Sequence, residues 1–121
     1  QAAAEEDIRE VNLRADLRLM RDRIRQYQAD HGGRLPDSDR IVSQLTLRTN
    51  AAGEVMPPDG WVRDYPHGPY LRRIPLNPFV NRQVQERIET VPNALGGGNV
   101  GWHYNPTTGE FRADDDVHAG L

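Results

Sequence analysis

The sequence predicts an α+β fold in which one long N-terminal α-helix packs against a small antiparallel β-sheet. Three observations support this prediction: apolar residues at helical spacing in the first part of the chain, alternating apolar and polar residues near its end, and a proline-rich segment between them. A sheet of three short strands is marginally stable by itself, so the helix must supply the other half of the core. We therefore expect one domain of 121 residues, with the helix over residues 1–31 and a head over residues 34–121.

The N-terminal helix has the clearest pattern in the sequence. Its apolar stripe follows a 4-3-4-3-4 spacing, which puts every member on one face of an α-helix: Leu13, Leu17, Met20, Ile24, Tyr27 and His31. Gly32 and Gly33 predict the C-terminal end of this helix, because glycine readily takes the left-handed conformation that ends helices. Ile8 and Val11 are the only large apolar residues before the stripe, so we expect the first turns to project beyond the head.

A short second helix is predicted at the start of the head. It would span about residues 39–47, with Asp37 or Ser38 as its N-terminal cap. Its buried residues would be Ile41, Val42 and Leu45. Residues 48–69 contain glycine, proline, asparagine and aspartate in turn-favouring roles, which predicts a loop.

Residues 68–81, GPYLRRIPLNPFVN, are proline-rich and have no helical or strand periodicity, yet they are too apolar for an idle surface loop. Prolines fix the path of a chain and lower the entropy of its unfolded state. We predict that this segment, here called the brace, is pinned to the core by Leu71, Ile74 and Phe79. A dedicated ligand-binding segment is the alternative interpretation.

Two β-elements are predicted after the brace. Residues 82–91 alternate apolar and polar side chains, which predicts a strand. Residues 100–113 predict a β-hairpin that turns at residues 105–109. The core-facing aromatic residues of this hairpin would be Trp102, Tyr104 and Phe111. His103 alternates with them and is expected to point away from the core.

The composition disfavours several kinds of chemistry. The chain has no cysteine and no lysine, which excludes thiolate nucleophiles, cysteine zinc sites and Schiff-base lysines. Its two serines, Ser38 and Ser43, lie in no catalytic motif, so a small hydrolase is a poor alternative. The net charge of −3 disfavours nucleic acid as a partner. No run of eighteen apolar residues exists to span a membrane.

Four stretches, in this order and spacing, resemble the type IV pilin-like family and, within it, the pseudopilins of type II secretion systems. They are DLRLMRDRIRQYQADHGGRLP, SQLTLRTNAAGEV, GPYLRRIPLNPF and GWHYNPTTGEFRADD. The resemblance implies a pilin-like fold and a structural role without catalysis. The chain would be a subunit of a type II secretion pseudopilus or related type IV pilus-like filament, which polymerises to drive protein export across the outer membrane. The alternative is a type IV pilus or minor pilin subunit in adhesion or DNA uptake.

The resemblance also implies partners and a location. The subunit would associate with itself into a filament, and with other pseudopilins, inner-membrane secretion components and secreted protein substrates. In this family a processed, methylated and strongly apolar helix half anchors the subunit in the inner membrane. The chain starts at Gln1 without an initiator methionine, so we expect such a half to precede it and these residues to form a periplasmic ectodomain.

Charge is segregated along the N-terminal helix. Acidic residues lie over residues 5–10, where Glu6 and Glu10 are the candidates for an assembly contact. Arginines then repeat at a 4-3-4 spacing beside the apolar stripe: Arg14, Arg18, Arg21 and Arg25. The plainer interpretation is a solvated face with ion pairs from Glu10 to Arg14 and from Asp22 to Arg18. In a filament of staggered parallel helices, one subunit's acidic turns could instead lie against a neighbour's arginine stripe.

The remaining candidate sites are acidic and histidine residues. Asp114, Asp115 and Asp116 form a tight acidic cluster, which we interpret as a frayed acidic tail. Major pseudopilins bind calcium near the end of the sheet, so the resemblance makes this cluster a weak calcium candidate. No other cofactor is expected. The four histidines have no metal-binding spacing and are predicted to be separate surface or turn residues: His31, His67, His103 and His118.

Overall fold

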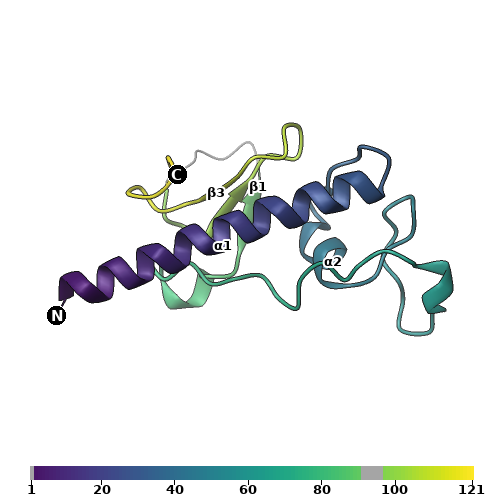
Figure 1. Ribbon diagram of the computed structural model, residues 1–121, viewed down its shortest axis with the longest axis horizontal. Helices are drawn as coiled ribbons and strands as arrows, with labels where there is room; N and C mark the ends of the chain where they lie inside the picture. The colour runs from purple at the N-terminus through teal and green to yellow at the C-terminus, as the bar shows by residue number, and fades with distance from the viewer. Residues whose placement is uncertain (1, 91–96) are drawn as a thin grey trace.

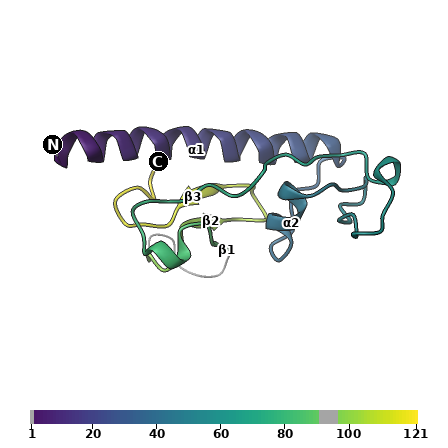
Figure 2. The same ribbon diagram turned by 90° about the horizontal axis from the view of Figure 1, so that it is seen from below.

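The computed structural model describes residues 2–90 and 97–121, with side chains from Ile8 onward (Figure 1). Its helices are α1 (Ala2–Asp30), α2 (Ile41–Thr46) and the short 3₁₀ helices η1 (Val62–Asp64) and η2 (Arg82–Val84). Its strands are β1 (Ile88–Thr90), β2 (Trp102–Tyr104) and β3 (Phe111–Ala113). Figure 2 shows α1 as a straight rod along one edge of the molecule, with the sheet and α2 both on the same side of this helix. The predicted α+β class, with a long helix packed on a small sheet, is confirmed.

The apolar stripe of α1 forms its contact with the head, as predicted. Each of the six stripe residues is at most 4% exposed. The helix ends where the glycines predict: Gly32 and Gly33 have φ of 66° and 92°, and the Gly33 amide donates to the Gln28 carbonyl oxygen over 2.9 Å. This bond satisfies one of the carbonyls that a helix end leaves open. Ile8 and Val11 are exposed, and the first turns of α1 extend beyond the sheet (Figure 2).

The sheet is mixed, so the prediction of an antiparallel sheet is wrong. Strand β2 lies in the centre, parallel to β1 and antiparallel to β3. A parallel pair cannot be joined by the short turn of a hairpin and needs a crossover connection instead. The predicted strand over residues 82–91 is also too long, because residues 82–84 form the 3₁₀ helix η2 and β1 begins only at Ile88. Asn81 starts that turn by accepting a hydrogen bond on its side chain from the Gln83 amide at 3.1 Å.

The predicted hairpin is confirmed. Strands β2 and β3 pair with Tyr104 opposite Phe111, and both residues are buried with Trp102 in the core. His103 is not the surface residue that was predicted, since it is only 9% exposed. A central strand has a neighbour on each side, so even its residue on the second face of the sheet is largely covered.

Helix α2 is shorter than predicted and lacks the predicted side-chain cap. Its N-terminal flanking residue is Arg40, which makes no side-chain capping bond. Asp37 does not cap because its carboxylate accepts hydrogen bonds from the side chains of Arg40, at 2.5 and 3.0 Å, and Gln44, at 3.2 Å.

The buried face of α2 differs from the prediction at two positions. Ile41 and Leu45 are buried as expected, but Val42 is exposed and Gln44 is buried instead. Gln44 is tolerated in the core because its amide group is fully used. Its nitrogen donates to the Gly53 carbonyl oxygen at 2.9 Å, and its oxygen accepts from the Asp37 amide at 2.8 Å.

The brace is pinned to the core as predicted. Leu71 and Ile74 are buried, and Phe79 packs partly buried against the core. Backbone and side-chain bonds fix the same segment to elements far away in the chain. The indole nitrogen of Trp102 donates to the Pro75 carbonyl oxygen at 2.8 Å, and the amides of residues 70 and 71 donate to the Leu45 carbonyl oxygen. The brace therefore joins α2 to the sheet.

Asn77 is the main polar residue of the brace and is fully buried. Its side-chain nitrogen donates to the Gly101 carbonyl oxygen at 2.8 Å and to Asp115 Oδ1 at 3.0 Å. Its side-chain oxygen accepts from the Phe79 amide at 2.9 Å. One side chain thus holds the start of β2, the C-terminal turn and the brace together.

Candidate assembly surface along α1

The arginine stripe lies along one flank of α1, as predicted, and three of its four members are exposed: Arg14, Arg18 and Arg25. Arg18 and Arg25 make no hydrogen bond or ion pair within residues 2–90 and 97–121. They are cations available to another molecule. Arg14 makes the predicted ion pair with Glu10, with 3.3 Å between Nη2 and Oε1.

The acidic half of the predicted contact is only partly described. The side chain of Glu6 lies outside the described residues. Glu10 is half-buried, and besides Arg14 it has His118 Nε2 at 3.8 Å. The predicted pair between Asp22 and Arg18 is wrong, because the Asp22 carboxylate binds the adjacent Arg23 at 2.6 Å and accepts a bond from Gln26 at 3.1 Å.

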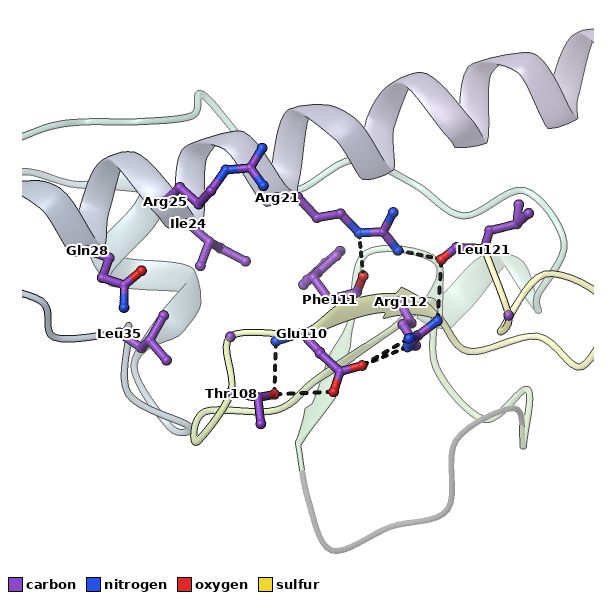
Figure 3. Close-up of a pocket in the computed structure, with 12 residues that line it drawn as sticks. Arg21, Ile24, Arg25, Gln28, Leu35, Thr108, Glu110, Phe111, Arg112 and Leu121 are labelled. Carbon is purple, nitrogen blue, oxygen red and sulfur yellow. Dashed lines mark hydrogen bonds and ion pairs between the residues drawn. The ribbon is translucent and has the colours of Figure 1, made fainter.

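Arg21, the fourth member of the stripe, is half-buried and acts as a clamp within the fold. Its Nε donates to the Phe111 carbonyl oxygen at 3.0 Å, and its Nη2 donates to the backbone oxygen of Leu121 at 2.6 Å (Figure 3). Burial lowers the pKa of Arg21, and the positive charges of Arg112 and Arg25 lower it further. An arginine still keeps its charge at neutral pH, so these bonds are charge-assisted.

Arg112 completes this clamp from β3. Its guanidinium donates to Glu110 Oε2, at 2.9 and 3.1 Å, and to the backbone oxygens of Ala119 and Leu121. Two arginines from α1 and β3 therefore hold the C-terminal residues beside the helix (Figure 3).

A groove of about 600 Å³ opens between α1 and the hairpin, next to the clamp (Figure 3). Its apolar wall comes from Ile24, Leu35 and Phe111, and Arg25 and Gln28 lie on its helix side. A smaller hollow of about 270 Å³ continues along the helix past Arg18. We call the side of α1 that carries Arg14, Arg18, Arg21 and Arg25 the arginine flank. It is hollowed, and it offers apolar surface together with unpaired positive charge. Such a surface suits a partner segment that carries both apolar and acidic side chains.

Replacing Arg21 by alanine is expected to lower the free energy of unfolding by about 1–3 kcal/mol, because two charge-assisted hydrogen bonds to half-buried carbonyls are lost. Arg25→Ala is the matched control on the same flank and is expected to change stability by less than about 0.5 kcal/mol. Urea denaturation followed by circular dichroism measures both. Equal midpoints for the two variants would contradict the role of Arg21 as a clamp.

The acidic cluster after β3 is not a frayed tail, which corrects the prediction. Asp114 and Asp115 are buried and only Asp116 is exposed. Asp115 Oδ2 lies 2.5 Å from His118 Nδ1, and its other oxygen accepts the bond from Asn77. In the part of the chain that the structure describes, no group of three or more His, Cys, Asp or Glu residues is placed to hold a metal ion.

The histidines also differ from the prediction, since three of the four are buried: His31, His103 and His118. His31 stacks on Tyr27 with 3.7 Å between ring centroids, and its ring nitrogens lie 2.6 Å from the Tyr27 carbonyl oxygen and 2.8 Å from Thr49 Oγ1. Its place at the end of the apolar stripe was the sequence signal for this burial. His118 gives no such signal, because it lies in a polar stretch, between its near partner Asp115 and the distant Glu10 on α1.

A polar latch ties the C-terminal end of α1 to the brace. The Tyr70 hydroxyl donates to Asp30 Oδ2 at 2.7 Å, and His67 Nδ1 lies 4.0 Å from the same oxygen. Burial raises the pKa of Tyr70, and its hydrogen bond to the Asp30 carboxylate raises it further. The phenol therefore stays protonated as a donor over the physiological pH range.

No protein-family model, curated protein or solved structure matches the chain. Within the described residues, no helix is both long and apolar enough to cross a lipid bilayer.

Proposed function

We propose that this chain is part of a structural subunit of a type II secretion pseudopilus or a related type IV pilus-like filament. The observation that carries the proposal is the arrangement of α1, a 29-residue helix whose stripe is covered by the head while its first turns project (Figure 2). The four sequence stretches that resemble pseudopilins lie at the helix end, α2, the brace and the hairpin. Three of these stretches form the head, and the first forms the part of α1 on which the head packs.

The proposed subunit acts by assembly and not by catalysis. Subunits add at a membrane base, and the growing filament pushes secreted protein outward. The longer protein would be held in the inner membrane by an apolar, methylated helix half that precedes Gln1, with these residues in the periplasm. Its partners would be further copies, other pseudopilins, inner-membrane secretion components and the exported proteins.

The arginine flank supplies one contact between neighbouring subunits in this proposal. With parallel, staggered helices, the acidic turns over residues 5–10 of one copy lie against Arg18 and Arg25 of the next. An exposed ion pair contributes less than about 1 kcal/mol, but the same pair repeats at every subunit of a filament.

Reversing Arg18 and Arg25 to glutamate in the full-length protein is expected to reduce filament yield several-fold, because both arginines would then repel the neighbour's acidic turns. The control is Arg34→Glu with Arg82→Glu, which reverses two exposed charges on the head. Yield is measured by shearing filaments from cells, followed by immunoblotting and electron microscopy.

The two parts of the proposal fail in different ways. Unchanged yield in the Arg18 and Arg25 variant would reject the arginine contact alone. Absence of filaments from the unaltered full-length protein, when it is overproduced with the other secretion components, would reject the filament function. The gene upstream of Gln1 gives a second test, since the proposal requires about twenty apolar residues behind a basic leader that ends in glycine.

The exposed arginines also favour a second candidate, a type IV pilus or minor pilin subunit in adhesion or DNA uptake. Such a subunit would bind DNA with an affinity that falls steeply as salt increases. The Arg18 and Arg25 variant would then lose DNA binding, measured by fluorescence anisotropy at several salt concentrations.

A further inference from the structure

The loop between α2 and the brace ends in an exposed apolar tip. Trp61 is 70% exposed and Val62 is 54% exposed, and η1 lies at the end of the molecule away from the N-terminus (Figure 1). We call residues 59–64 the Trp61 tip. The sequence identified this region only as loop, because its turn residues carry no signal for exposure.

The tip has a fixed shape. The amides of Asp64 and Tyr65 donate to the carbonyl oxygens of Trp61 and Val62, each at 3.0 Å. Arg48 Nε donates to the Tyr65 carbonyl oxygen at 2.9 Å and ties the loop to the residues after α2. A pre-shaped loop that presents tryptophan loses little conformational entropy on binding, and tryptophan is enriched among the residues that dominate interface energies.

A second apolar feature lies beside the sheet. A groove of about 790 Å³ runs between α2, the brace and β1, and we call it the β1 groove. Its apolar lining is Val42, Ile74, Leu76, Ile88 and Val100. Val42 and Leu76 are large apolar residues that remain exposed there. Exposed apolar surface gathered in a concave site is typical of an interaction surface.

The charges of the tip and the groove are complementary. The tip has acidic residues at both ends, Asp59 and Asp64, and one cation, Arg63, which gives it a net charge of about −1. The groove is lined by three arginines and two glutamates, a net charge of about +1: Arg72, Arg73, Arg87, Glu86 and Glu89. Complementary charge around an apolar contact favours one orientation of docking and speeds association.

One copy does not join its own tip to its own groove. Figure 1 shows η1 displaced from β1 along the long axis of the molecule, with α2 between them. A second copy can supply the missing half. Each copy then offers one tip and one groove, so the contact is heterologous and can repeat along a line of subunits.

We propose that the Trp61 tip of one copy docks in the β1 groove of a second copy. The Trp61 indole and Val62 lie on the apolar lining, and the tip carboxylates face the groove arginines. This contact uses neither the arginine flank nor the groove of Figure 3. It goes beyond the proposed function, because it requires only that copies of this chain meet.

Mixed cysteine cross-linking tests the contact, since the chain has no cysteine of its own. Val62→Cys and Leu76→Cys are prepared as separate proteins of the 121-residue chain, one with an affinity tag, and are mixed under mild oxidation. We expect at least tenfold more tagged–untagged dimer from this mixture than from Val62→Cys mixed with Val117→Cys, which places an exposed cysteine on the C-terminal turn. Equal yields from the two mixtures would overturn the proposal.

Sedimentation equilibrium of the same chain gives an independent test. We expect Trp61→Ala to raise the dissociation constant of self-association at least tenfold. Arg72→Glu with Arg73→Glu should do the same, and mixing that variant with Asp59→Arg, Asp64→Arg should restore association. Self-association that is absent at millimolar concentration, or unchanged in Trp61→Ala, would overturn the proposal. Neither result bears on filament formation by the full-length protein, so failure here is distinct from failure of the proposed function.

Discussion

Replacing Gly101 by alanine is expected to lower the free energy of unfolding by about 3 kcal/mol, the upper end of the usual cost of overpacking. A Cβ atom at this position would lie 2.0 Å from the Gln85 carbonyl oxygen and 2.7 Å from its carbon. Both are backbone atoms, so no side-chain rotation relieves the clash. The backbone must therefore move, and this movement disturbs the hydrogen bonds of Gly101. Its amide donates to the Val84 carbonyl oxygen, and its carbonyl oxygen accepts from the Asp114 amide and the Asn77 side chain.

The matched control is Gly120→Ala, where an added Cβ meets no atom within 4 Å. It is expected to change stability by less than about 0.5 kcal/mol. Urea denaturation followed by far-ultraviolet circular dichroism compares the two variants with the unaltered chain. If Gly101→Ala unfolds at the same urea concentration as Gly120→Ala, the close approach of residue 101 to residue 85 is wrong.

Replacing Trp102 by alanine is expected to cost about 3–5 kcal/mol, as for other large aromatic residues removed from a core. Trp102 is 0% exposed, packs beside Phe111 with 5.4 Å between ring centroids, and donates to the Pro75 carbonyl oxygen. Domains of this size are stable by only about 5–15 kcal/mol. The variant should therefore lose a large fraction of its stability and unfold at a markedly lower temperature than the unaltered chain, measured by thermal denaturation.

The other tryptophan of the chain provides the control. Trp61 is mostly exposed and lies outside the core, so Trp61→Ala should leave stability within about 0.5 kcal/mol of the unaltered chain. Fluorescence distinguishes the two residues, because a buried indole emits at shorter wavelength than an exposed one. The result would contradict the structure if Trp61→Ala lost the short-wavelength emission or destabilised the fold as much as Trp102→Ala.

The features that the sequence predicted are those set by local patterns. The stripe from Leu13 to His31 depends only on helical spacing, and the hairpin depends on alternation around a turn. The parallel pairing of β1 could not be predicted, because it depends on how the chain returns from Thr90 to Trp102. The length of β1 could not be predicted either, because residues 82–91 alternate like a strand although Asn81 starts a 3₁₀ turn at their beginning.

The candidate site was predicted less well than the fold because its polar contacts join distant segments. Arg21 looks like any other member of its stripe, but its partners lie 90 and 100 residues later in the chain. Asp115 and His118 are polar residues in a polar stretch, and Asp115 accepts a hydrogen bond from Asn77, which lies 38 residues earlier in the chain. Local polarity predicts solvent exposure, whereas a distant polar partner permits burial.

The ties between α1 and the head are spread along the helix: Arg21 binds β3 and the C-terminal residues near its middle, and Asp30 binds Tyr70 at its end. Consider a force that pulls the helix along its axis while the head is held. This force loads the ties and the contact between the apolar stripe and the head at the same time, in shear. Bonds loaded side by side share the tension, whereas bonds peeled from one end break in turn. The helix and head are therefore joined in the geometry that best resists axial traction.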